Sequence, residues 1–184
     1  IYLCGSEDEF VKLMNEKAEE LGLENTHFTN ASGLYDPNHY STATDIAMLM
    51  SAVMENDTCR EILGTYQYTT SATEQHPKGI PLESTMFSRM YGNEVTGITI
   101  EAGKTGYTDE AGHCLVSYAT DADGKQFIAV TAKGPTYWRA VFDTFAIYGL
   151  VHDGYPMPDN LAAQETDENG SAIDPTETST APAA

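Results

Sequence analysis

The spacing of apolar residues changes at about Gly97, and this change restricts the possible folds more than any other feature of the chain. Three β-rich runs follow that glycine, and their sequences are GITIEAGK, HCLVSYAT and KQFIAVTAK. The last two runs are separated by DADG, a sequence typical of a tight hairpin turn. A helical pattern rich in aromatic residues, TYWRAVFDTFAIYGL, comes next. We therefore expect an antiparallel meander followed by a helix that covers the sheet.

Helical patterns dominate the chain before this meander. Ser6 and Glu9 form a capping box at the start of SEDEFVKLMNEKAEELG, which predicts a helix. Thr42 and Asp45 form a second capping box before another apolar helical pattern. The segment TCREILG predicts a short third helix capped by Thr58, whereas HPKGIPL is expected to be loop. Helices that are followed by antiparallel strands define an α+β fold.

The composition divides the chain into two parts. Residues 1–150 contain the helical and β patterns and are expected to form one folded domain. Residues 151–184 contain seven acidic residues, no Lys or Arg, and few large apolar side chains. Such a segment cannot bury enough apolar surface to offset the loss of chain entropy. We expect residues 151–184 to be an acidic low-complexity tail or linker.

The charge balance and the metal-binding residue types exclude several classes of protein. The chain has 9 Lys and Arg against 28 Asp and Glu, so its formal net charge is -19. A surface this acidic repels nucleic acid and anionic membranes, and we expect neither as a partner of this segment. The three cysteines and five histidines show no metal-ligand spacing, so no metal site and no cofactor are predicted.

The tripeptide Lys104-Thr105-Gly106 closes the first β run. Taken alone it is a weak motif, because a solvated lysine at the end of a strand followed by a turn glycine is common. Its position gives it more weight, since a Gly-containing turn and an antiparallel partner strand follow. An ammonium group and a hydroxyl together can hold a carboxylate through charge-assisted hydrogen bonds. Glycine would leave the strand open to a ligand, and an edge strand can pair with an extended peptide.

Several motifs occur in one order along the chain and cover roughly residues 5–150. They are FVKLMN at 10–15, NTHF at 25–28, HYSTA at 39–43 and KTGYTDEAG at 104–112. In these motifs the chain resembles the serine-type D-alanyl-D-alanine carboxypeptidases, which are low-molecular-mass penicillin-binding proteins. The resemblance implies the serine β-lactamase/transpeptidase-like fold, an antiparallel sheet with helices packed on it. It also implies removal of the terminal D-alanine of the peptidoglycan stem pentapeptide through an acyl-serine.

The same resemblance assigns roles to four consecutive residues. Lys104 and Thr105 would bind the terminal carboxylate of the substrate, and Gly106 would help to position the peptide. The strand near Tyr107 would supply one amide of the oxyanion hole, and its ring is expected to line the cleft. His113 is expected to be structural rather than catalytic. The implied partners are the stem peptide and, in the intact protein, β-lactams, and the implied location is outside the bacterial cytoplasm.

Two other motifs of this mechanism are missing. None of the ten serines begins an S-x-x-K or an S-x-N sequence, so this chain contains neither the nucleophile nor its activating lysine. The Tyr91-Gly92-Asn93 sequence imitates a variant of the second motif, but its position indicates a turn. We therefore expect the N-terminal part of the catalytic domain to be missing and the chain alone to be inactive. Two alternatives remain at this point, a non-catalytic module that binds wall peptides and a serine β-lactamase.

Overall fold

A computed structural model of the chain describes residues 2–90 and 95–151. Its main sheet has three antiparallel strands in the order β3-β4-β5, with bounds Ile98–Thr108, Gly112–Asp121 and Gln126–Gly134. The expected meander is therefore confirmed, including the turn at residues 121–124. The expected turn at residues 91–93 lies outside the described residues, as does the expected tail at 151–184 apart from Val151, which ends the last helix.

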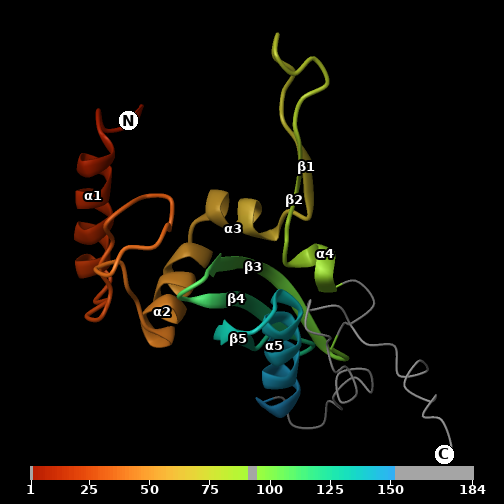
Figure 1. Cartoon of the computed structure of the whole chain (residues 1–184). Helices are drawn as coiled ribbons and strands as arrows, with labels where there is room; N and C mark the ends of the chain where they lie inside the picture. Colours follow the sequence, from red (N-terminus) through yellow and green to blue (C-terminus); the bar gives the residue numbers. More distant parts are fainter. Residues whose placement is uncertain (1, 91–94, 152–184) are drawn as a thin grey trace, which may run out of the picture.

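Helices cover both faces of this sheet (Figure 1). Helix α5, Tyr137–Val151, packs on one face and buries Val141, Phe145 and Tyr148 against Leu115 and Ala119 of β4. Helices α2, Ala43–Met54, and α3, Asp57–Gly64, lie on the other face. Two methionines of α2 and a leucine of α3 pack there against β-strand residues; the set comprises Met50, Met54, Leu63, Ala102 and Tyr118. Alternate residues of β4 face opposite layers because successive side chains of a strand point to opposite sides.

The first two helices begin where their capping boxes predict. Helix α1, Glu7–Glu20, is capped by Ser6, whose hydroxyl accepts the Glu9 amide at 3.1 Å. Helix α2 is capped in the same way, since the Thr42 hydroxyl accepts the Asp45 amide at 3.1 Å. The predicted N-cap of α3, Thr58, is two residues C-terminal to the observed one. Its cap is Asn56, whose side-chain oxygen accepts the Cys59 amide at 3.0 Å.

Asp45 performs a second structural task besides its place in the α2 cap. Its carboxylate is buried and accepts the Thr26 hydroxyl at 2.7 Å and the Asn25 amide at 2.8 Å. The hydrogen bond from Thr26 is the main cause that lowers the pKa of this carboxyl group, and the Asn25 amide acts in the same direction. Asp45 thus fastens the loop after α1 to the start of α2.

A small hairpin includes the end of HPKGIPL, a segment that was expected to be loop. Strands β1, Gln67–Thr69, and β2, Pro81–Glu83, pair antiparallel and form an arm that projects from the body of the domain (Figure 1). The loop prediction for HPKGIPL was therefore wrong at its end, where Pro81 and Leu82 belong to β2. Pro81 is tolerated because β2 is an edge strand. The short helix α4, Phe87–Met90, follows this arm.

Several apolar side chains of the helices remain exposed. On α1 only Ala18 is fully buried, and Leu13 is 49% exposed. On α5 Ile147 and Leu150 are exposed. Within the part of the chain that the structure describes, no helix has the length and apolar character needed to cross a bilayer.

Candidate functional site

The Lys104-Thr105-Gly106 motif lies on β3, at one edge of the three-stranded sheet. Each of its residues is paired with β4 on its inner side, Lys104 with Val116 and Gly106 with Cys114. The outer edge of β3 has no partner strand among the described residues. Free amide and carbonyl groups along such an edge can form a ladder with an extended peptide. The predicted position of the motif on an edge strand is confirmed for the described sheet.

The Lys104 side chain is exposed beside this edge. Its ammonium group donates a hydrogen bond to the backbone carbonyl of Thr105 at 2.5 Å, so the charged atom turns back over its own strand. Neither of the two salt bridges found among residues 2–90 and 95–151 involves Lys104. Because a carbonyl is neutral, it does not compensate the charge of this ammonium group. The group can therefore bind an anionic ligand.

The residues around the motif control the space available on β3. Gly103 is buried, and a Cβ atom there would lie 2.2 Å from the Met86 sulfur and 2.8 Å from the Val116 carbonyl oxygen. A Cβ atom at Gly106 would have no heavy atom within 4 Å. Gly103 therefore serves close packing in the core, whereas Gly106 leaves an open position on the strand next to Lys104 and Thr105.

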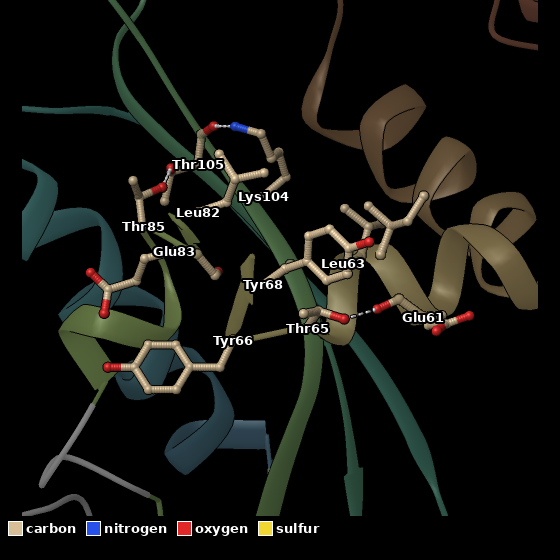
Figure 2. Close-up of a pocket in the computed structure, with 13 residues that line it drawn as sticks. Glu61, Leu63, Thr65, Tyr66, Tyr68, Leu82, Glu83, Thr85, Lys104 and Thr105 are labelled. Carbon is tan, nitrogen blue, oxygen red and sulfur yellow. Dashed lines mark hydrogen bonds between the residues drawn. The ribbon is translucent and has the colours of Figure 1, made fainter. Parts of the chain in front are cut away.

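A cavity of about 730 Å³ borders the motif. It lies between the end of α3, the β1–β2 arm and β3, and Figure 2 shows Leu82 of the arm beside Lys104 and Thr105. Its walls combine aliphatic and aromatic side chains with several hydroxyls, the carboxylates of Glu61 and Glu83, and Lys104. The lining residues that matter below are Tyr66, Tyr68, Leu82, Thr85, Lys104 and Thr105. This size and this mixture of groups are typical of small-ligand sites.

Tyr107 is 59% exposed and belongs to an aromatic stack beside the motif. Its ring stacks on His113 with centroids 4.3 Å apart, and His113 meets Tyr137 edge-on at 5.4 Å. The Tyr107 hydroxyl donates to the Asp109 carboxylate at 2.5 Å, and this hydrogen bond is the main cause that raises the pKa of the phenol. Burial is the main cause that lowers the pKa of His113, and the charge of Arg89 adds to it.

This arrangement separates the predicted site residues into two groups. Lys104 and Thr105 line the cavity. Tyr107 is not among the residues of this cavity and stacks on His113, and its expected place in the substrate cleft stays a prediction. His113 holds the aromatic stack together, which agrees with its expected structural role.

Sequence reasoning missed the cavity residues that the β1–β2 arm and the segment after it contribute. Tyr66, Tyr68 and Leu82 come from the β1–β2 arm, and Thr85 follows it. No short motif marks these residues. A detectable signal was the alternation in TYQYTT, which places Tyr66 and Tyr68 on one side of a strand. Among the described residues, no group of three His, Cys, Asp or Glu side chains is arranged to hold a metal ion.

An antiparallel sheet between helical layers, with Lys-Thr-Gly on its edge strand, defines the penicillin-binding class of folds, and solved structures agree. The model aligns with penicillin-binding protein 5 from Haemophilus influenzae at a TM-score of 0.69 and 26% identity, over 81% of this chain and 40% of that one. It aligns with a D-alanyl-D-alanine carboxypeptidase from Mycobacterium tuberculosis at a TM-score of 0.64 and 26% identity, over 84% and 58%. The expected α+β transpeptidase-like fold is confirmed.

The sequence comparisons are more specific. Residues 2–136 match the family model described as Peptidase_S11, D-alanyl-D-alanine carboxypeptidase, and the chain belongs to this family. It is 37% identical over 119 residues to the D-alanyl-D-alanine carboxypeptidase DacF of Bacillus subtilis, and 32% identical over 139 residues to DacA of Haemophilus influenzae. These alignments cover 64% and 74% of this chain but only 28% and 32% of the relatives. The chain thus spans about a third of their length.

Proposed function

We propose that this chain is the carboxylate-binding part of a serine D-alanyl-D-alanine carboxypeptidase that removes the terminal D-alanine of the peptidoglycan stem pentapeptide. The observation that carries this proposal is the placement of Lys104 and Thr105 side by side on an edge strand that borders a cavity. The family membership of residues 2–136 supports the choice of substrate.

Each residue of the motif has a separate task in this proposal. The Lys104 ammonium group leaves its weak partner, the Thr105 carbonyl, and binds one oxygen of the terminal carboxylate. The Thr105 hydroxyl donates to the other oxygen. The peptide lies along β3, and Gly106 lets it approach because no side chain occupies that position. A backbone amide near Tyr107 stabilises the negative charge that develops on the carbonyl oxygen during acylation.

The chain's own residues bind and orient the substrate but do not attack it. We propose that a serine outside these 184 residues forms the acyl-enzyme with release of D-alanine, and that water then releases the shortened peptide. The same serine would be acylated by β-lactams. Residues 1–150 would form part of this catalytic domain, 151–184 would form an acidic tail or linker, and the protein would act in the bacterial cell envelope, outside the cytoplasm.

Carboxylate recognition is tested with the ¹⁵N-labelled chain and two ligands, N-acetyl-D-alanyl-D-alanine and its methyl ester. The free acid is expected to shift the amide signals of residues 104–107, and the ester is expected to bind at least tenfold more weakly because Lys104 then faces no charge. Lys104→Met should remove the preference for the acid. Lys12→Met, a change of an exposed lysine on α1, is the matched control and should keep it. Equal binding of acid and ester by the unmodified chain would overturn the proposal.

The absence of the nucleophile from the chain is tested separately. A fluorescent penicillin followed by a denaturing gel is expected to leave this chain unlabelled, because none of its serines lies in S-x-x-K. A labelled band would show that a residue of the chain can be acylated, and the assignment of the attack to a serine elsewhere would then be wrong.

A further inference from the structure

A second threonine, Thr85, contacts the Lys-Thr-Gly motif although it is not part of the motif. The Thr85 and Thr105 hydroxyls are in direct hydrogen-bond contact, although 20 residues separate them in the sequence. Both line the cavity, and Figure 2 shows the two side chains facing each other next to Lys104. Thr85 is exposed, so packing does not account for its contact with Thr105.

The backbone of Thr85 is held by the short helix that follows it. The Arg89 guanidinium donates a hydrogen bond to the Thr85 carbonyl, and the Ser88 hydroxyl donates to the same oxygen at 3.4 Å. Arg89 is itself fixed, because its guanidinium lies 4.2 Å from the centroid of the Tyr137 ring at the start of α5. The Thr85 hydroxyl therefore occupies a defined position and is not the tip of a free loop.

Arg89 also supports the other side of the motif. Tyr137, which Arg89 covers, meets His113 edge-on, and His113 stacks on Tyr107. Two chains of contacts thus run from one arginine to the residues on either side of Gly106. One ends on the Thr105 hydroxyl through Thr85, and the other ends on the Tyr107 ring.

The hydrogen bond between the Thr85 and Thr105 hydroxyls can have either residue as the donor, and the choice matters for ligand binding. A threonine hydroxyl has one proton, and either oxygen of the pair can be the donor. If Thr85 donates to Thr105, the Thr105 proton is free to point at a ligand. A carboxylate beside Lys104 selects this arrangement, because it accepts the Thr105 proton in a charge-assisted hydrogen bond. Hydrogen bonds in such a chain strengthen one another.

We propose that Thr85, fixed by Arg89, is a positioning residue that directs the Thr105 proton toward the substrate carboxylate. This inference rests on the proposed function, since it concerns the same carboxylate site. It adds a residue from outside the Lys-Thr-Gly motif, and it attributes part of the affinity for the acid to the orientation of a single proton.

The test compares Thr85→Val with Thr85→Ser in titrations with N-acetyl-D-alanyl-D-alanine and its methyl ester, using the ¹⁵N-labelled full chain. Valine keeps the shape of the side chain but has no hydroxyl, so affinity for the acid should fall about threefold to tenfold. Affinity for the ester should stay within twofold. Serine restores the hydroxyl and should restore the preference for the acid. Thr99→Val removes an exposed hydroxyl from β3, the strand that carries Thr105. It is the matched control and should have no effect on binding of either ligand.

The outcomes separate this inference from the proposed function. If the unmodified chain prefers the acid and Thr85→Val retains that preference, the role of Thr85 is refuted while the carboxylate site stands. If the unmodified chain does not distinguish acid from ester, the proposed function itself fails. A parallel loss of affinity for both ligands in Thr85→Val would indicate a purely structural effect and would also overturn the inference. Arg89→Met provides an independent check, and it should lower the preference for the acid in the same direction.

Discussion

Replacement of Tyr148 by phenylalanine should weaken the fold and also change how its stability depends on pH. Tyr148 lies on α5 and is only 1% exposed. Its hydroxyl donates to the Ser117 carbonyl at 3.1 Å and pairs with the Ser117 hydroxyl at 2.8 Å. Ser117 is completely buried on β4, so these contacts join the sheet to its covering helix. Phenylalanine keeps the ring and removes only this link.

The structure sets the size of both effects. A buried hydroxyl that loses its partner costs about 1–3 kcal/mol, and this is the expected loss for Tyr148→Phe at pH 8. Burial also raises the pKa of Tyr148 to about 12, despite the opposing hydrogen bond from Ser117. The folded state thus favours the neutral phenol, and this contribution to stability is complete below pH 10 and is lost as the pH rises from 10 to 12. Because one pKa unit corresponds to a little over 1 kcal/mol, roughly 1 kcal/mol should be lost by pH 11.

Urea unfolding of the chain and of Tyr148→Phe at pH 8 and pH 11 measures both effects. The variant lacks the ionisable group, so the difference in unfolding free energy between the two proteins should shrink by roughly 1 kcal/mol at pH 11. Ser117→Ala in the Tyr148→Phe background should cost less than in the unmodified chain, because the two hydroxyls satisfy each other. A difference that stays constant with pH would refute the argument about Tyr148 burial, and additive losses would refute the coupling.

Three further changes test other parts of the structure. Gly103→Ala should destabilise the fold by about 1–3 kcal/mol in urea unfolding, because its Cβ would collide with the Met86 sulfur, and a loss below 0.5 kcal/mol would contradict this. Gly106→Ala should leave stability within about 0.5 kcal/mol, because its Cβ meets nothing, yet it should weaken binding of N-acetyl-D-alanyl-D-alanine. Thr42→Ala should cost about 1 kcal/mol through loss of the α2 cap, whereas Thr42→Ser should restore stability.

Local signals in the sequence predicted most of the regular structure. The capping residues Ser6 and Thr42 begin α1 and α2 as expected, because a cap involves only atoms within one turn of helix. The β-rich runs after Gly97 form the meander for a similar reason, since hairpin partners are neighbours in the chain. The cap of α3 was misplaced because Asn56 and Thr58 are both good caps, and only the structure distinguishes them.

The site was predictable only in part. The Lys104-Thr105-Gly106 motif and the strand that carries it follow from the sequence, and the structure places two of its side chains on a cavity. The contribution of Tyr66 and Tyr68 to the cavity was missed because no local pattern indicates the direction of the hairpin arm that carries them. The stack of Tyr107 on His113 joins two neighbouring strands, and the sequence did not predict this contact.

The sequence by itself determined the class of fold, the family resemblance and the position of the Lys-Thr-Gly tripeptide. It could do so because periodicity, caps and short motifs depend on residues close together in the chain. Tertiary structure alone decided that Thr85 meets Thr105 and that Arg89 supports both flanks of the motif. Those contacts join α4, β3 and α5, and they exist only after the sheet and its helices have packed. The strand thus presents the motif, while residues far away in the sequence orient it.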